Sequence, residues 1–275
     1  MALDDIFSLK GKVIVITGAA GLLGLMHAEA VAQSGGIPIL IDLKESRVDK
    51  IAEDLVKKFQ CQAAWFVVDI TNESQIEKNV SEIVALFGKI DGLVNNASNN
   101  PQVSADNQEK FTRLENFSLQ DWQDDMNVGL TGAFLCAKHY GYEISKNPAG
   151  GAIINVSSDL GLIAPDQRLY SKGGLSSDNP VKPVTYSVVK TGLIGLTRYL
   201  ATYWAEQNVR CNAICPGGVN NGQPQEFLAK VHSRIPMGRL AHKSEYQGTL
   251  IWMLSGASSY LTGAVVPVDG GRTVW

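Results

Sequence analysis

The sequence has few of the residues that build disulfide frameworks, metal sites or nucleic-acid surfaces. Its 275 residues include four cysteines and four histidines, with no C-x-x-C pair and no ligand spacing among the histidines. Buried, reduced thiols therefore fit better than disulfides or zinc. Lysine and arginine number 24 against 27 aspartates and glutamates, a net charge of −3. This balance lacks the positive excess that binds phosphate backbones, so we expect no metal and no nucleic-acid partner.

Long apolar runs are also missing. The longest uncharged apolar stretch, residues 13–26, contains three glycines and is shorter than a membrane-spanning helix. The first seven residues are acidic, whereas a secretory signal peptide begins with basic residues. A hydrophobic content of 45% beside 19% charged residues is typical of a globular protein. We expect a cytoplasmic protein with no membrane partner.

Short β-branched runs alternate with helical patterns from one end of the sequence to the other. Seven runs resemble strands: residues 12–17, 37–41, 65–68, 93–94, 152–156, 209–214 and 264–268. Two segments between them carry apolar residues at helical spacing: Val48, Ile51, Leu55 and Phe59, then Ile76, Val80, Ile83 and Phe87. Runs that are apolar on both faces indicate a parallel sheet covered by helices. The sequence predicts an α/β fold, a doubly wound Rossmann-type parallel sheet with helices on both faces.

A glycine-rich turn follows the first predicted strand. Gly18, Gly21 and Gly24 precede or open a helix expected over residues 22–34. Glycines allow the backbone to turn tightly and approach a diphosphate, which the free N–H groups of a helix N-terminus attract. The spacing is G-x-x-G-x-x-G, not the better-known G-x-G-x-x-G, and loops also gather glycine for turns alone. The turn nevertheless predicts nucleotide binding.

The second predicted strand ends at an acidic residue. Asp42 lies 18 residues after Gly24, where an acid accepts ribose hydroxyls and repels a 2′-phosphate. Lys44 would soften that preference, and the alternative is that Asp42 only caps the next helix. We predict NAD as cofactor, with NADP less favoured. With no linker or repeat in the sequence, residues 1–275 are predicted to form one dinucleotide-binding domain.

Tyr186 and Lys190 lie four residues apart at the start of a long apolar helical pattern, so their side chains share one helical face. A phenol with a pKa of about 10 is a poor base at neutral pH. A neighbouring ammonium favours the phenolate and lowers that pKa, which allows proton exchange with an alcohol. Surface Tyr–Lys pairs at this spacing are common, so the pair alone is a weak signal.

Several short segments in a fixed order strengthen the interpretation. They are residues 17–24, Asp69-Ile70, N-N-A-S at 95–98, I-I-N-V-S-S at 153–158, Tyr186 with Lys190, P-G-G-V at 216–219, Y-L-T-G at 260–263 and V-D-G-G at 268–271. The ordered set resembles the short-chain dehydrogenase/reductase family over essentially the whole chain.

The resemblance implies a role for each matching residue. Ser158 would polarise the substrate oxygen, Tyr186 would be the general acid/base, and Lys190 would lower the tyrosine pKa and hold the nicotinamide ribose. The cofactor-binding residues would be Gly18, Gly21, Leu23, Gly24, Asp42, Asp69, Ile70, Asn96, Ala97, Lys190, Pro216, Gly217, Gly218 and Val219. If Tyr186 and Lys190 were absent, it would be equally plausible that Ser157 and Ser158 only satisfy backbone groups at a strand end. The same holds for the alternative that Asn95 and Asn96 only form a turn.

Three features depart from the family pattern. Leu22 stands where the family has the middle glycine of its turn, and Gly129 stands where many members have an asparagine that completes a proton relay. Asn127 points to a different helical face and is no obvious substitute. The third departure is the separation of 28 residues between Ser158 and Tyr186, longer than is usual.

The long separation predicts a substrate-loop insert at about residues 159–184. Its polar and charged residues include Asp159, Asp166, Arg168, Tyr170, Lys172, Asp178 and Lys182. Arginine and lysine here would grip a phosphate or carboxylate, or would only keep a solvated loop soluble. The segments 164–170, 182–187 and 215–220 resemble a subgroup known as flagellin-modification oxidoreductases, which is associated with unusual amino sugars.

The predicted function is NAD-dependent interconversion of a secondary alcohol and a ketone on a polar, sugar-like small molecule. A 3-oxoacyl thioester reductase is the alternative among enzymes, and a silent dinucleotide-binding protein is the alternative outside them. The resemblance further implies a homotetramer or homodimer. Candidate interface residues are Phe134, Leu193, Leu196, Tyr199, Trp204, Val274 and Trp275, although such residues also complete cores.

Overall fold

Within the residues that the structure describes, 3–99, 112–170 and 179–275, seven parallel strands form one sheet. The structure is a computed structural model, and its sheet order is β3-β2-β1-β4-β5-β6-β7. The strands are β1 (Val13–Thr17), β2 (Ile37–Asp42), β3 (Ala64–Val67), β4 (Gly92–Asn95), β5 (Gly151–Val156), β6 (Val209–Pro216) and β7 (Val265–Val268). Each strand coincides with a predicted run to within two residues. The predicted α/β, doubly wound Rossmann-type fold is confirmed.

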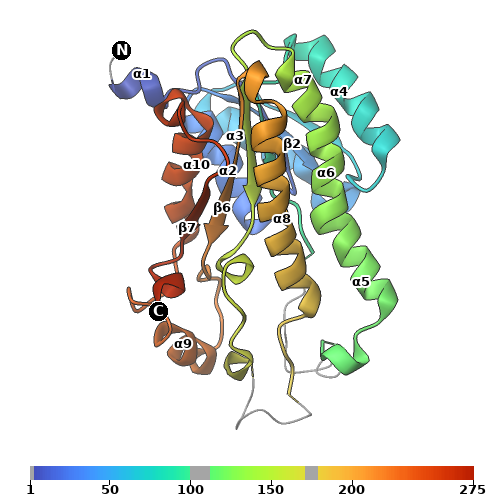
Figure 1. Ribbon diagram of the computed structural model, residues 1–275. Coiled ribbons are helices and arrows are strands. Elements are labelled where there is room, and N and C mark those ends of the chain that lie inside the picture. Colours follow the sequence, from blue (N-terminus) through green and yellow to red (C-terminus); the bar gives the residue numbers. More distant parts are fainter. Residues whose placement is uncertain (1–2, 100–111, 171–178) are drawn as a thin grey trace.

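Helices cover both faces of the sheet (Figure 1). One face carries α2 (Leu22–Gln33), α3 (Val48–Phe59) and α10 (Gln247–Leu254). The other carries α4 (Glu73–Phe87), α8 (Val184–Tyr203) and a long helical segment that begins with α5 (Leu119–Met126). Two further helices, α1 (Leu3–Phe7) and α9 (Gln225–His232), lie outside these layers. The predicted stripes of α3 and α4 face opposite sides of the sheet, and each belongs to a separate core cluster.

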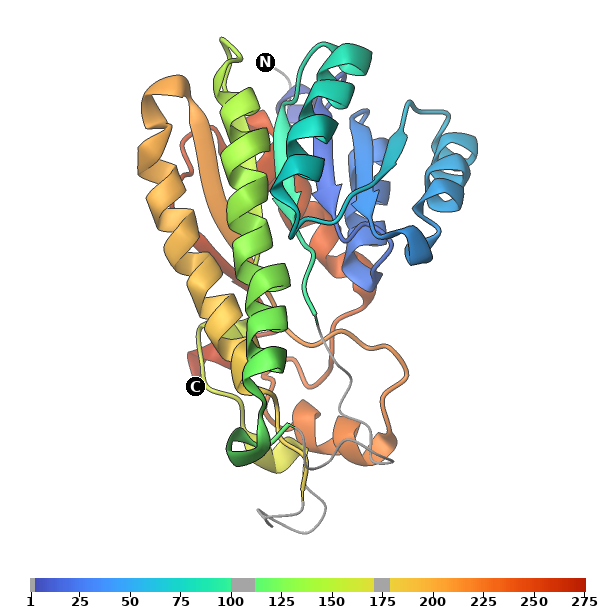
Figure 2. The ribbon, with the colours of Figure 1, turned by 90° about the vertical axis from the view of Figure 1, so that its right-hand side faces the viewer.

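The long helical segment contains two π-helical turns. The turns Asn127–Thr131 and Ala137–Gly141 connect α5 to α6 (Gly132–Cys136) and α6 to α7 (Tyr142–Ser145). A π turn accommodates one extra residue in a helix and is often found at functional sites. Figure 2 shows this segment in green beside α8 in orange, and α5 contacts α8 directly. The first π turn therefore lies next to the helix that carries Tyr186 and Lys190.

The expectation that strands are buried on both faces is wrong at the edge of the sheet. All five residues of β1 are buried, but Trp65 and Val67 of β3 are 45% and 47% exposed. In the described part of the chain β3 pairs only with β2, so one side of the strand has no neighbour. Trp65 and Val67 alternate with Ala64 and Phe66, so they share one face of β3, and this face is only partly covered.

The candidate interface residues divide into two groups. Phe134 and Tyr199 are exposed, whereas Leu193 and Trp204 are buried in the core, so the expectation is wrong for the latter pair. The helix face of α8 that carries Leu193 packs inward, and sequence spacing alone did not separate the two faces. Among the described residues, no helix combines the length and the apolar character that crossing a membrane requires.

Sheet order fixes where a ligand can bind. After β3 the chain crosses to β4, which lies beside β1, and the connections that leave β1 and β4 run in opposite directions. In open parallel sheets this switch leaves a crevice at the carboxyl ends of the strands. The glycine turn after β1, the N-N-A-S segment after β4 and Ser158 after β5 all lie at that edge.

Candidate functional site

A cavity of about 1210 Å³ occupies the carboxyl edge of the sheet. Asp42, the last residue of β2, and Ile70, which follows β3, line one part of it, and Ser158 and Tyr186 line another. The ends of β2 and β5 are three strand spacings apart, roughly 14 Å. The cavity is therefore long enough for an extended ligand such as a dinucleotide.

The glycine turn is shaped by close backbone contacts. Gly18 has a φ of +62°, and a Cβ there would lie 2.8 Å from the Cα of Ala97. A Cβ on Gly24 would lie 2.1 Å from the carbonyl oxygen of Gly18. The amide of Asn96 fixes the turn by donating to the carbonyl oxygens of Thr17 and Gly18, both at 3.0 Å. Gly18 lines the cavity, whereas Gly24 lies beneath the turn and does not.

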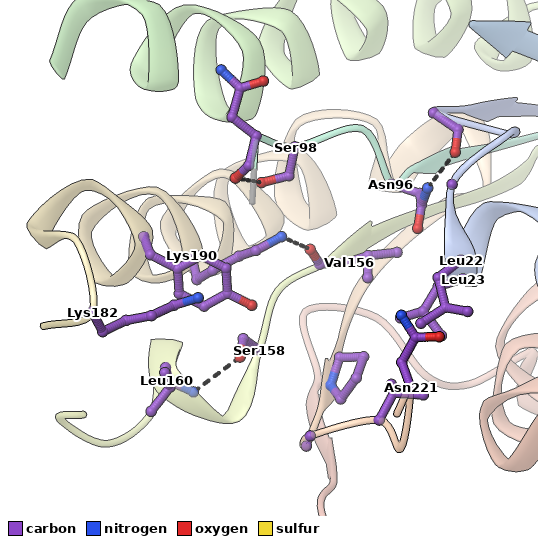
Figure 3. Close-up of a pocket in the computed structure, with 18 of the residues that line it drawn as sticks. Leu22, Leu23, Asn96, Ser98, Val156, Ser158, Leu160, Lys182, Lys190 and Asn221 are labelled. Atoms are coloured by element: carbon purple, nitrogen blue, oxygen red, sulfur yellow. Dashed lines mark hydrogen bonds between the residues drawn. The ribbon is translucent and has the colours of Figure 1, made fainter. Parts of the chain in front are cut away.

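The N-terminus of α2 points its first turn toward the cavity. The helix begins at Leu22 after Gly21, and no side chain in the described part of the protein caps it. Its first N–H groups are thus available to an anionic ligand. Leu22 occupies the place of the missing family glycine and lines the cavity with Gly21 and Leu23 (Figure 3). The substitution leaves the helix N-terminus open toward the cavity.

Asp42 lies at the cavity end nearest α3. Its two carboxylate oxygens accept the main-chain N–H groups of Ala20 and Leu43, each at 2.8 Å. Each oxygen retains a further lone pair for a ligand hydroxyl. The alternative role of capping the next helix is not seen, because Asp42 is bonded to the glycine turn and to its own neighbour.

The structure brings most of the predicted cofactor-binding residues together. Apart from Gly24, all of them line the cavity: Gly18, Gly21, Leu23, Asp42, Asp69, Ile70, Asn96, Ala97, Lys190, Pro216, Gly217, Gly218 and Val219. The uncapped helix, the glycine turn and the carboxylate at the far end fit a dinucleotide with a diphosphate in its middle. Asn95 is different, because its amide is buried and donates to Asn155 in the core.

Ser158, Tyr186 and Lys190 meet at the other end of the cavity. Ser158 follows β5, and the two other residues lie one helical turn apart near the start of α8. The Lys190 ammonium lies 5.7 Å from the centre of the Tyr186 ring and donates to the carbonyl oxygen of Val156 at 2.9 Å (Figure 3). The predicted shared helical face is therefore present.

Burial controls the ionisation of this group. It raises the pKa of the Tyr186 phenol, and the hydrogen bond with Ser158 acts in the opposite direction. Burial also lowers the pKa of Lys190 to about 8, with a further contribution from the positive charge of Lys182. The sequence led us to expect Lys190 to lower the tyrosine pKa. In the structure Arg272 lowers the pKa of Tyr186, Asp159 raises it, and burial is the largest contribution.

An ion pair absent from the sequence prediction adjoins Ser158. Asp159 accepts a hydrogen bond from the Ser158 hydroxyl at 2.8 Å and from Arg272 at 2.8 Å. Asp159 and Arg272 are both buried and both line the cavity. The only signal in the sequence is an arginine directly after the closing V-D-G-G segment. Its relevance appears when β6 and β7 bring that segment beside the end of β5.

The position of the absent relay asparagine is filled from α8. Gly129 is buried in the first π turn, and a Cβ there would lie 2.5 Å from Cγ1 of Val189. Any larger side chain at residue 129 would collide with this valine. Asn127, by contrast, is exposed. Val189 therefore occupies the space that an asparagine at position 129 would need.

The insert contributes unequally to the cavity. Tyr170 and Lys182 line it, whereas Arg168 is bound to Asp166 through two nitrogens at 2.8 and 2.9 Å. Lys172 and Asp178 lie outside the described residues. Of the charged residues expected to grip an anion, the structure thus brings Lys182 to the substrate end.

A group of potential metal ligands lies elsewhere, on α4 and the second π turn. Glu73, Glu77 and His139 place one ligand atom each within 4.8 Å of one another. The Lys138 ammonium lies 2.6 Å from the Glu73 carboxylate, and His139 lies 2.8 Å from it. An ion pair with Lys138 and a hydrogen bond with His139 therefore engage Glu73 of this cluster.

Comparisons with known proteins point to one family. A family model described as enoyl-(acyl carrier protein) reductase matches residues 18–273. An NADP-dependent mannitol dehydrogenase of Hypocrea jecorina is 32% identical over 276 residues, 98% of this chain and 95% of the relative. An NAD-dependent glycerol dehydrogenase of Listeria innocua is 31% identical, covering 98% and 97%. The crystal structure of a short-chain type dehydrogenase/reductase from Mycobacterium marinum is 26% identical with a TM-score of 0.84, covering 99% of both chains.

Fold, cavity and matches together define a nicotinamide-dinucleotide-dependent oxidoreductase that acts on CH–OH groups. The chain belongs to the short-chain dehydrogenase/reductase family, as the ordered motifs predicted. The two curated relatives are named for different cofactors, NADP in one and NAD in the other.

Proposed function

We propose that this enzyme interconverts a secondary alcohol and a ketone on a polar, sugar-like substrate, with NAD as cofactor and Tyr186 as general acid/base. The observation that carries the proposal is the meeting of Ser158, Tyr186 and Lys190 at one end of a cavity whose other end holds the glycine turn and Asp42. The bound nicotinamide would accept or supply the hydride. The protein's own groups would move the proton.

Each of the three residues has a separate task in this proposal. In oxidation Tyr186 takes the hydroxyl proton at its phenol oxygen, and in reduction it returns that proton to the ketone oxygen. Ser158 hydrogen-bonds the substrate oxygen, which requires its hydroxyl to turn away from Asp159. Lys190 keeps a positive charge beside the phenol and offers its remaining N–H groups to the cofactor ribose. A ligand that excludes water would strengthen each of these interactions.

NAD is favoured over NADP by Asp42, because a fixed carboxylate repels a 2′-phosphate. The names of the relatives support either cofactor, so the preference rests on this residue. Relatives named for mannitol and glycerol support a polyhydroxy substrate. Relatives named 3-oxoacyl-[acyl-carrier-protein] reductase, 32% and 30% identical to this chain, keep a 3-oxoacyl thioester reductase as the second candidate.

We also propose one domain with a substrate-loop insert at about 159–184, and a cytoplasmic homotetramer or homodimer. Exposed aromatic residues on α6 and α8 support association. Phe134 is 50% exposed, and Tyr199 and Tyr203 of α8 are 61% and 60% exposed. The terminal residues Val274 and Trp275 are 77% and 75% exposed and offer a second apolar surface.

Nicotinamide absorbance with a substrate panel tests the proposal. Free, phosphorylated and nucleotide-linked sugars and sugar alcohols would be compared with acyl thioesters, each with NAD and NADP. We expect turnover of at least one sugar-like alcohol or ketone with NAD. Turnover confined to acyl thioesters with NADPH would favour the reductase, and cofactor binding with no turnover in either direction would favour a silent binding protein.

A further inference from the structure

Asp159 lies where the chain leaves β5, directly after Ser158. One of its carboxylate oxygens accepts the Ser158 hydroxyl and the main-chain N–H of Leu160, each at 2.8 Å. The other oxygen accepts the Arg272 guanidinium at 2.8 Å. Ser158, Asp159 and Arg272 are all buried. The carboxylate is therefore held in one orientation, with one oxygen directed at the Ser158 hydroxyl.

The Ser158 hydroxyl connects this carboxylate with Tyr186. A carboxylate only accepts hydrogen bonds, so Ser158 donates its proton to Asp159 and keeps two lone pairs for other donors. The N–H of Leu160 donates to the Ser158 oxygen at 3.2 Å (Figure 3). Tyr186 is also hydrogen-bonded with Ser158, and its phenol can donate to the second lone pair. A chain of hydrogen bonds thus leads from Tyr186 through Ser158 to Asp159.

The proposed reaction needs such a chain. Each alcohol oxidation leaves a proton on Tyr186, and this proton must leave before the next hydroxyl can be deprotonated. Burial raises the pKa of the phenol, so the phenol does not lose its proton readily at neutral pH. Gly129 stands where many family members have the asparagine that completes a proton relay, and Val189 fills the space beside it. The proton therefore needs a path that does not use residue 129.

We propose that Ser158 and Asp159 form a proton relay that returns Tyr186 to the phenolate between turnovers. After the product has left, the Ser158 hydroxyl turns back to Asp159, which is the arrangement in the structure. The O–H bond of Tyr186 then breaks as its proton binds the Ser158 oxygen, and the original Ser158 proton passes to Oδ1 of Asp159. Ser158 ends unchanged, Tyr186 is a phenolate, and Asp159 is a neutral acid.

Asp159 can release this proton because it lines the cavity. A neutral Asp159 leaves the buried charge of Arg272 uncompensated, so the proton moves on to water in the cavity and the ion pair forms again. In reduction the same steps run in reverse and supply a proton to Tyr186. Asp159 thus acts through Ser158 and Tyr186, not on the substrate itself. This inference rests on the proposed function, because it requires Tyr186 to exchange a proton with the substrate.

Asp159→Asn tests the relay with the best alcohol of the substrate panel and NAD. The amide keeps the shape and an acceptor for Ser158, but it cannot take up a proton. We expect kcat to fall about tenfold or more, while KM and the NADH affinity measured by fluorescence stay within about twofold. Arg272→Met breaks the same ion pair but keeps the carboxylate, so it should lose less turnover. Thermal melting would confirm that each variant folds.

Chemical rescue separates proton transfer from ion pairing. Asp159→Ala leaves room for a small anion between Ser158 and Arg272. Formate and acetate can take up a proton, whereas nitrate can pair with Arg272 but cannot. We expect formate and acetate, but not nitrate, to raise the turnover of Asp159→Ala about fivefold or more. Asp166→Asn is the matched control: its carboxylate pairs with two other arginines, so acetate should not change its turnover.

Several results would overturn the relay. Asp159→Asn could keep wild-type turnover, or Arg272→Met could lose as much turnover as Asp159→Asn. Rescue of Asp159→Ala could also fail, or nitrate could rescue it as well as acetate does. In each case the wild type still oxidises the alcohol, so the proposed function stands and only this inference is rejected. A wild type that oxidises no alcohol of the panel would instead reject the proposed function, and the relay with it.

Discussion

Asp42 is held in place by main-chain groups on both sides. Its carboxylate oxygens accept the N–H groups of Ala20 and Leu43, so the negative charge has a fixed position at the edge of the cavity. A ribose hydroxyl can donate to the remaining lone pairs, whereas a 2′-phosphate would meet an uncompensated carboxylate. The preference proposed for NAD thus depends on charge more than on shape.

Asp42→Asn should remove most of that preference. The amide keeps the shape and one acceptor oxygen for Ala20, but it no longer repels a phosphate. We expect the ratio of kcat/KM for NAD over NADP to fall about tenfold or more. Glu45→Gln is the control, since Glu45 is exposed nearby and does not line the cavity. An unchanged ratio in Asp42→Asn would show that another residue selects the cofactor.

The buried His27 side chain makes the stability of the fold depend on pH. It is fully buried on α2, neither ring nitrogen has a hydrogen-bond partner among the described residues, and burial lowers its pKa to about 4. In the unfolded chain His27 takes up a proton near pH 6.5, whereas in the folded protein it does so only near pH 4. The folded protein therefore keeps its full stability above pH 6.5 and loses stability relative to the unfolded chain as the pH falls toward 4. From pH 7 to pH 5 the loss should be about 2 kcal/mol.

Urea unfolding of the wild type and His27→Leu at pH 7 and pH 5 measures this contribution. Leucine binds no proton. Between pH 7 and pH 5 the free energy of unfolding should therefore fall by about 2 kcal/mol less in His27→Leu than in the wild type. Parallel losses in the two proteins would mean that other groups cause the pH dependence.

At the scale of elements, the contact between α8 and the first π turn sets the shape of the catalytic end. Val189 lies between Tyr186 and Lys190 in the sequence, and its Cγ1 fills the space beside Gly129. Valine at 189 and glycine at 129 are thus complementary in volume. Restoring an asparagine at 129 would require a smaller residue at 189.

Gly129→Ala should lower the free energy of unfolding by about 1–3 kcal/mol, because the added Cβ overlaps Val189. Val189→Ala in the same chain should relieve the overlap. Urea unfolding of the two single variants and the double variant would give a favourable coupling of about 1 kcal/mol or more. If the two changes are additive, the helices move apart without strain and the volumes are not complementary.

Sequence patterns predicted the elements because the forces that form them are local. The stripe of Ile76, Val80, Ile83 and Phe87 indicates a helix by its period alone, and the seven apolar runs indicate strands in the same way. The π turns were missed, since an extra residue in a helix leaves no clear mark on an apolar pattern. Edge exposure at Trp65 was missed because it depends on strand order.

Most of the candidate site was also predictable, since the motif residues follow strand ends that meet at one edge of the sheet. The Asp159–Arg272 pair and the Gly129–Val189 contact were not. Each joins residues that are far apart in the sequence, and their meeting depends on how β7 and α8 pack. The sequence did not distinguish Lys182 from the other charged residues of the insert. In the structure Lys182 lines the cavity, whereas Arg168 is bound to Asp166.

At the scale of the whole molecule, the outer face of α8 predicts association. Tyr199 and Tyr203 stack with their ring centres 5.6 Å apart and are both largely exposed. Tyr199→Asp should reduce the mass measured by light scattering from that of a tetramer or dimer to that of a smaller species. Leu86→Asp on α4, also at an exposed apolar residue, should leave the mass unchanged. A monomeric wild type would contradict the proposed assembly.

Replacement of Tyr186 by phenylalanine tests the proposed chemistry most directly. The variant keeps the ring beside Lys182 and Lys190 but loses the oxygen that would carry the proton. With the best substrate of the panel, turnover should fall about 10²- to 10⁴-fold, while NADH binding measured by fluorescence stays within about twofold. A variant that retains wild-type turnover would show that the proton moves through another group and would remove Tyr186 from the reaction.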